Sequence, residues 1–103
     1  MTKFSSGSIG WIDGTWGSTE KLSIPICDRG LTLGDGLFET ILIYKGVPKL
    51  LTSHLNRMQK GASILKMNAP PSEEYLRPLI AEGISRSSLE NKNGVLRLNW
   101  SRG

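Results

Sequence analysis

The sequence predicts an α+β fold, in which a mostly antiparallel β-sheet carries two α-helices packed on one side. Apolar residues alternate with a period of two near both ends of the chain. Two segments between these ends show the period of a helix instead. Tight-turn dipeptides such as Asp13-Gly14 join neighbouring β segments, which favours antiparallel pairing. Strands and helices therefore form separate runs along the chain.

Size and composition are typical of one globular domain covering residues 1–103. The chain has 38% hydrophobic and 21% charged residues, which is enough for a modest core. No apolar run approaches the ~18 residues of a membrane span, and the first ten residues lack the apolar centre of a signal peptide. The one cysteine, Cys27, excludes an internal disulfide and favours a reducing compartment, so we expect a cytoplasmic protein without a membrane partner.

The net charge of +4 and the pI of about 9.5 leave two interpretations, a solvated basic surface or a face for nucleic acid. The lysines and arginines are dispersed, and no block of five or six like charges occurs. The dispersion favours a solvated surface, so we predict no nucleic-acid partner.

The first elements are β segments. Residues 8–16 predict a hairpin with Asp13-Gly14 at its turn, because both residues tolerate the positive φ of a type I′ turn. Residues 21–27 alternate, but Pro25 cannot donate to a ladder, which predicts an edge strand or an irregular crossing.

The stretch "CDRGLTLGDGLFETILIYKG" begins with turn residues and continues as a strand over 37–44. Both faces of this strand are mainly apolar, which predicts a central strand covered on two sides. Glu39 interrupts one face, and Phe38 lies on the other. Residues 47–51 predict a short return strand.

Two helices and a last strand follow. In residues 51–67 one helical face carries Leu51, Leu55, Met58, Ala62 and Leu65, and Thr52 or Ser53 is the predicted N-cap. The second helix is predicted to begin at Ser72, with Glu73 and Glu74 in its first turn. Its apolar face carries Leu76, Leu79, Ile80 and Ile84, and Pro78 predicts a kink or a late start. Residues 95–101 alternate again as a strand.

The glycines of the central stretch do not match a phosphate-binding loop. Gly34 and Gly36 form G-x-G, but Glu39 stands where a dinucleotide motif needs glycine, and no G-K-[ST] occurs. A strand follows instead of the helix N-terminus that both motifs use. We therefore interpret these glycines as turn geometry.

Three polar residues remain open in function. Glu39 is costly to bury unless it is paired, but it could also lie near the exposed start of its strand beside a surface lysine. His54 and Arg57, at i and i+3, share one side of the first helix. His54 could cap or pack, and Arg57 could extend to solvent or bind a phosphate. One Cys and one His make a metal site improbable, and we predict none.

The motifs "DRGLTLGDGLFET", then "HLNRM", then "NGVLRLNWSRG", taken in order, resemble the N-terminal domain of the class IV, fold-type IV pyridoxal-phosphate-dependent aminotransferases and lyases. The resemblance extends from the hairpin to the last residues. It implies that Arg57 binds the phosphate of pyridoxal 5'-phosphate, and that Phe38 and Glu39 lie at the substrate pocket.

The resemblance also implies what these residues lack. The family's catalytic lysine, which forms the Schiff base with the cofactor, belongs to a C-terminal domain, and no lysine here stands in such a motif. We expect residues 1–103 to be the N-terminal half of a two-domain enzyme, inactive without the other half.

Among family members, the motifs look most like those of 4-amino-4-deoxychorismate lyase, which forms 4-aminobenzoate and pyruvate for folate synthesis. Branched-chain and D-amino-acid aminotransferases are the alternative. The resemblance implies an amino-acid-like substrate and a homodimer with an apolar, partner-facing surface. A non-catalytic module that binds anions or nucleic acid is the alternative from another class.

Overall fold

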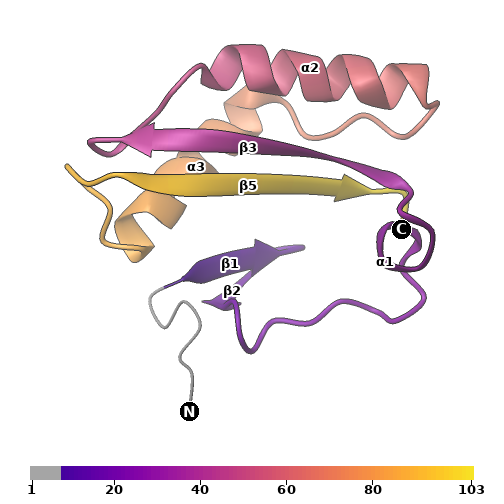
Figure 1. Ribbon diagram of the computed structural model, residues 1–103, viewed down its shortest axis with the longest axis horizontal. Coiled ribbons are helices and arrows are strands. Elements are labelled where there is room, and N and C mark those ends of the chain that lie inside the picture. The colour runs from indigo at the N-terminus through magenta and orange to yellow at the C-terminus, as the bar shows by residue number, and fades with distance from the viewer. Residues whose placement is uncertain (1–7) are drawn as a thin grey trace.

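The computed structural model describes residues 8–103. Most of the N-terminal stretch considered above for a signal peptide, residues 1–7, lies outside this range. The elements in chain order are β1 (Ile9–Ile12), β2 (Thr15–Ser18), α1 (Arg29–Leu33), β3 (Gly36–Tyr44), β4 (Val47–Pro48), α2 (Leu51–Ile64), α3 (Glu73–Arg86) and β5 (Gly94–Ser101) (Figure 1). The predicted α+β class is confirmed.

Antiparallel pairing joins the strands into two sheets. The larger sheet has the order β4-β3-β5, so β3 is the central strand as predicted. Its long ladder runs from the pair Gly36↔Ser101 to the pair Ile43↔Gly94. The hairpin β1-β2 forms the smaller sheet, and Asp13 and Gly14 take positive φ at its turn, as predicted. Residues 21–27 form no strand, so the irregular crossing is the correct alternative.

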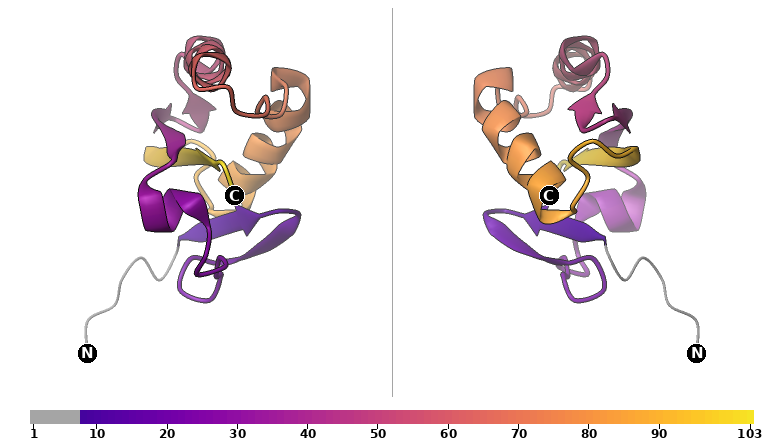
Figure 2. Two further views of the ribbon diagram at one scale, coloured as in Figure 1. Left: turned by 90° about the vertical axis from the view of Figure 1, so that its right-hand side faces the viewer. Right: turned by 90° about the vertical axis from the view of Figure 1, so that its left-hand side faces the viewer.

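The core lies between the larger sheet and the two long helices. Ile41 of β3, Leu51 and Leu55 of α2, and Leu76 and Ile80 of α3 form one buried cluster, with Leu96 and Leu98 of β5 packed against it. Figure 2 shows α2 and α3 on the same side of β3 and β5. The two helical periods and the alternation of β5 therefore meet in one core, which explains why these segments adopt their predicted structure.

The opposite face of β3 corrects one prediction. Phe38, Leu42 and Tyr44 are 58%, 53% and 45% exposed, so in residues 8–103 the strand is covered on one side only. The hairpin leaves these three side chains exposed, and its strand β1 packs against α3.

The helix ends differ from prediction in detail. The residue before α2 is Leu50 with φ 55°, without a side-chain cap, so the predicted caps Thr52 and Ser53 are wrong. Ser72 does cap α3, and its hydroxyl accepts a hydrogen bond from the Tyr75 amide at 3.2 Å. Pro78 predicted a kink or a late start, and because α3 begins at Glu73 with Pro78 inside it, the late start is excluded.

Candidate functional site

Glu39 is the buried charged side chain of the described residues. It stands in the fourth position of β3, on the face that α2 covers, and is 5% exposed. Burying an unpaired carboxylate is costly, so such a group needs hydrogen-bond donors around it. Alternation along β3 directs Glu39 toward α2 together with Ile41 and Ile43, which are both buried.

Arg57 supplies two of the donors. Its Nε donates to Glu39 Oε2 at 2.9 Å, and its Nη2 donates to Glu39 Oε1 at 2.8 Å. This two-pronged geometry is the strong form of an arginine–carboxylate pair. Arg57 comes from the middle of α2, so the pair connects the helix to the central strand.

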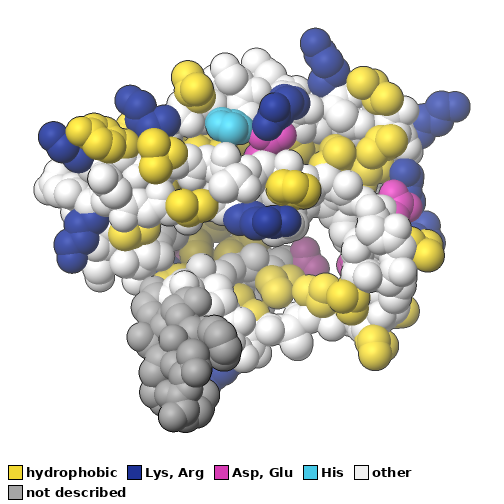
Figure 3. Space-filling view, viewed as in Figure 1, with side chains coloured by type: hydrophobic (Ala, Val, Ile, Leu, Met, Phe, Trp, Pro, Cys, Tyr) yellow, Lys and Arg dark blue, Asp and Glu magenta, His cyan; other side chains and the backbone are white. Residues whose placement is uncertain are grey.

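His54 supplies the third contact. Its Nδ1 lies 2.6 Å from Glu39 Oε1, and its side chain is 21% exposed. An ionised carboxylate can only accept hydrogen bonds, so Nδ1 is the donor. Because His54 and Arg57 are three residues apart, they lie on the same side of α2 and contact one carboxylate together. Figure 3 shows the histidine, in cyan, beside an acidic and a basic side chain at the molecular surface.

The electrostatics of this cluster follow from these contacts. The hydrogen bonds from Arg57 lower the pKa of the Glu39 carboxyl below its ordinary value of 4.5, burial opposes this shift, and the hydrogen bond from His54 adds to it. The same pair raises the pKa of the Arg57 guanidinium. Glu39 is therefore ionised at neutral pH, and Arg57 keeps its positive charge.

Arg57 still has donors to offer. Its side chain is 73% exposed, although one edge of the guanidinium faces Glu39. Within residues 8–103, the guanidinium donates its hydrogen bonds to Glu39 through Nε and Nη2. A guanidinium has five N–H donors, and the two hydrogen bonds to Glu39 leave three of them free toward solvent. This outer edge can bind an anion with planar, two-pronged geometry, such as a phosphate.

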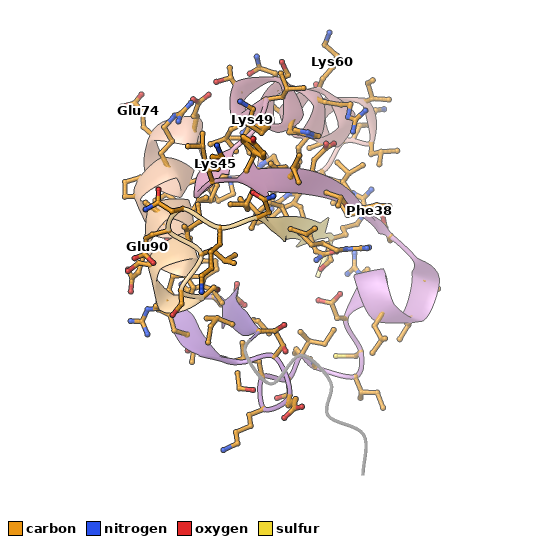
Figure 4. All side chains as sticks on the ribbon, turned by 60° about the vertical axis from the view of Figure 1, so that its left-hand side comes forward. Phe38, Lys45, Lys49, Lys60, Glu74 and Glu90 are labelled. Atoms are coloured by element: carbon orange, nitrogen blue, oxygen red, sulfur yellow. The ribbon has the colours of Figure 1, made fainter. Side chains whose placement is uncertain are left out.

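Phe38 lies apart from the cluster of Glu39, His54 and Arg57. It precedes Glu39 in β3, so its ring points to the opposite, uncovered face of the sheet. The Arg97 guanidinium of β5 stacks over this ring, 4.2 Å from its centroid. Figure 4 shows Phe38 near the start of β3, with Lys45 and Lys49 toward the other end of the strand. The structure thus brings the predicted site residues Glu39 and Arg57 into contact, and it places the ring of the third, Phe38, on the other face of the sheet.

The turn before β3 is anchored to the C-terminal end of β5. Asp28 caps α1 through the Gly30 amide at 2.8 Å, and it also accepts a hydrogen bond from the Ser101 hydroxyl at 3.0 Å. Asp35 pairs with Arg102 at 2.6 Å. Gly34 ends α1 in the left-handed conformation, with φ 63°, as the turn interpretation of the glycines requires. These contacts fix where β3 begins, and hence where Phe38 and Glu39 lie.

Two other classes of site find no support in the part of the chain that the structure describes. There, no three His, Cys, Asp or Glu side chains gather closely enough to hold a metal ion. None of the helices formed by residues 8–103 has both the length and the hydrophobicity of a membrane span.

Reasoning from the sequence missed two contacts. It placed His54 beside Arg57 on the helix but did not connect either residue to Glu39, although a carboxylate in a buried strand is itself a signal that donors lie nearby. The stacking of Arg97 on Phe38 was also missed. The ladder pairs Phe38 with Asn99 and Thr40 with Arg97, so this contact is diagonal, and only the register reveals it.

Known proteins resemble this chain in sequence. The family model of amino-transferase class IV matches residues 36–103. A putative branched-chain-amino-acid aminotransferase of Methanocaldococcus jannaschii is 28% identical over 93 residues, which are 90% of this chain and 32% of that protein.

Two solved structures extend the comparison. The pyridoxal-phosphate-bound form of a hypothetical aminotransferase from Mycobacterium tuberculosis superposes with a TM-score of 0.73 and 29% identity, covering 88% of this chain and 32% of that one. The 4-amino-4-deoxychorismate lyase of Pseudomonas aeruginosa gives a TM-score of 0.58 and 35% identity, covering 76% and 27%. The chain thus spans between 27% and 32% of the length of these three proteins.

Proposed function

This chain belongs to the amino-transferase class IV family, and we propose that it is the N-terminal domain of a lyase of that family, with Arg57 as the phosphate-binding residue. Enzymes of this family depend on pyridoxal phosphate, and one structural neighbour is a complex with it. When bound, this cofactor acts as an electron sink for bonds at the α-carbon of an amino substrate.

One observation carries the proposal: the outer edge of Arg57 is free while its inner edge is held by Glu39. A phosphate monoester needs donors that are charged, accessible and fixed in direction. The guanidinium of Arg57 meets these three conditions. In this proposal, Arg57 anchors the cofactor at its phosphate, remote from the atoms that react.

The proposed substrate is 4-amino-4-deoxychorismate, which the lyase converts to 4-aminobenzoate and pyruvate for folate synthesis. The 35% identity to the lyase of Pseudomonas aeruginosa supports this choice. The matched proteins also include aminotransferases, so branched-chain or D-amino-acid transamination is the alternative. Phe38 is the proposed pocket residue, since its ring is exposed. The predicted substrate contact of Glu39 stays a prediction.

The remaining parts of the active site belong, in this proposal, to a second domain. The catalytic lysine would come from that C-terminal domain, which would make these 103 residues the N-terminal domain of a two-domain enzyme. The chain covers about a third of the matched proteins, which supports this division into two domains. We further propose that the enzyme is a cytoplasmic homodimer.

A titration with pyridoxamine 5'-phosphate tests the phosphate site. This probe carries the phosphate but no aldehyde, so it does not react with surface lysines. We expect Arg57→Ala to weaken its binding to the 103-residue chain by about tenfold or more, because a charge-assisted hydrogen bond is lost. Isothermal titration calorimetry or chemical-shift titration measures the affinity.

Two controls make the result specific. Arg77 is also an exposed arginine paired with a glutamate, so Arg77→Ala changes the net charge equally and should leave binding almost unchanged. Pyridoxamine without the phosphate should bind wild type and Arg57→Ala alike. Equal affinity of wild type and Arg57→Ala for the phosphorylated probe would remove Arg57 from the site.

A further inference from the structure

We propose that Glu39 is a positioning residue, which, with the support of His54, holds the Arg57 guanidinium in the orientation that binds phosphate. This inference rests on the proposed function of Arg57 and deepens it. It gives Glu39 a role that acts through Arg57 and needs no contact with the substrate.

The contacts assign this role by their asymmetry. Glu39 is 5% exposed and fixed in the central strand, whereas the Arg57 side chain is 73% exposed on a helix surface. A long exposed arginine samples many rotamers and loses that freedom when it binds a ligand. The two hydrogen bonds to Glu39 remove much of the freedom beforehand, so less is lost when phosphate arrives.

His54 fixes the carboxylate in turn. Its Nδ1 contacts Glu39 Oε1, the oxygen that also accepts from Arg57 Nη2. The carboxylate plane is therefore defined from two directions, by residues one turn apart on α2. A guanidinium is planar, so fixing its inner edge also fixes the direction of its outer N–H groups.

Simple charge arithmetic predicts the opposite effect, which makes the inference testable. A carboxylate near a phosphate repels it, so its removal through charge alone should tighten binding. If Glu39 positions Arg57, its removal should weaken binding instead. The sign of the change in affinity therefore separates the two effects.

The experiment is a double-mutant cycle on the 103-residue chain with pyridoxamine 5'-phosphate as the probe. Glu39→Gln keeps the size of the side chain and should weaken binding by about three- to tenfold, the cost of ordering one long side chain. In the Arg57→Ala background, the same substitution should produce no weakening. Glu73→Gln is the matched control: it removes one negative charge from another arginine pair and should not weaken binding.

A second readout follows the arginine directly. In ¹⁵N–¹H spectra of the wild type, the Nε–H resonance of Arg57 should be sharp and protected from exchange with water. In Glu39→Gln this resonance should be lost, while the backbone amide resonances remain those of a folded protein. His54→Ala should broaden it, and His54→Asn, which retains a donor near the Nδ1 position, should restore part of the protection. If Glu39→Gln does not fold, the variants His54→Ala and His54→Asn test the inference instead, by probe affinity and by the Arg57 resonance.

Each failure points to a different error. Unchanged or tighter binding in folded Glu39→Gln, or in His54→Ala where the Gln variant does not fold, would overturn the positioning role. So would an equal loss in both backgrounds of the cycle. Wild-type affinity in Arg57→Ala would instead overturn the phosphate site itself, and this inference with it.

Discussion

At the scale of single residues, the Glu39 carboxylate is the group on which the proposed site depends. It connects β3 to α2 through three contacts, two from Arg57 and one from His54. A carboxylate buried with this many donors has a defined cost when it is protonated, because the donors then lose their acceptor. The site should therefore respond to acid.

We predict that Glu39 makes the fold sensitive to pH below neutrality. Arg57 holds the pKa of Glu39 below its ordinary value of 4.5 in the folded chain. The resulting stabilisation is fully present above that ordinary value and is lost as the pH falls through the lowered folded pKa. Urea unfolding between about pH 6 and about pH 3 should show a decreasing free energy of unfolding, and Glu39→Gln should flatten this dependence.

Glu73→Gln provides the comparison for this measurement. Arg77 and Thr52 likewise lower the pKa of Glu73, but Glu73 lies at the surface, where water screens the pair. The substitution Glu73→Gln should therefore change the pH dependence of the free energy of unfolding less than Glu39→Gln does. Parallel pH curves for wild type and Glu39→Gln would contradict the assignment of the acid sensitivity to Glu39.

The sequence indicated parts of this cluster but not their contact. The helical spacing of His54 and Arg57 was readable, and so was the oddity of a carboxylate inside an apolar strand. The contact of Glu39 with His54 and Arg57 could not be predicted, because it depends on the position of α2 along β3. That offset is set by packing among residues such as Ile41 and Leu55, distant in sequence, which no local pattern encodes.

At the scale of elements, β3 organises the molecule. It is the central strand, it pairs with β5 along eight registered positions, and it separates a buried face from an exposed one. The buried face contains Ile41, at 0% exposure, and the opposite face contains Leu42, at 53%. Two neighbouring apolar residues thus have opposite environments.

This contrast predicts unequal effects of two similar substitutions. Ile41→Ala should lower the free energy of unfolding by about 2–5 kcal/mol, because it opens a cavity in the core. Leu42→Ala should change it by no more than about 0.5 kcal/mol, because its side chain already meets water. Denaturant unfolding of both variants measures the difference. Similar losses for the two would mean that the outer face is covered in solution.

Element by element, periodicity predicted the hairpin, both long helices and the last strand. Two features escaped it. Helix α1 has five residues, too few to show a helical period, and it depends on contacts such as the hydrogen bond between Asp28 and Ser101. Thr52 looked like a cap, but its hydroxyl donates to Glu73 of α3 at 3.0 Å instead. In both cases tertiary contacts overrode the local signal.

At the scale of the whole molecule, the two sides of the sheet differ. One side holds the core beneath α2 and α3. The other exposes Phe38, Leu42, Tyr44 and Val95. Apolar residues gathered on one face are a common mark of an interaction surface. This arrangement agrees with a domain that works together with further structure, as the proposed two-domain enzyme requires.

The family assignment was readable from the order and spacing of three motifs, and the family match confirms it. The choice between lyase and aminotransferase was not readable, since both activities share the phosphate anchor. The proposed phosphate-binding role of Arg57 is therefore the same for either activity. A direct test of that role therefore tests the proposed function whichever activity the enzyme has.

The most direct measurement is a crystal structure of the chain with pyridoxamine 5'-phosphate. We predict phosphate oxygens within hydrogen-bonding distance of the outer guanidinium edge of Arg57, with the pair to Glu39 intact. A probe bound with its phosphate remote from Arg57, or an Arg57 that leaves Glu39 to reach the phosphate, would contradict it.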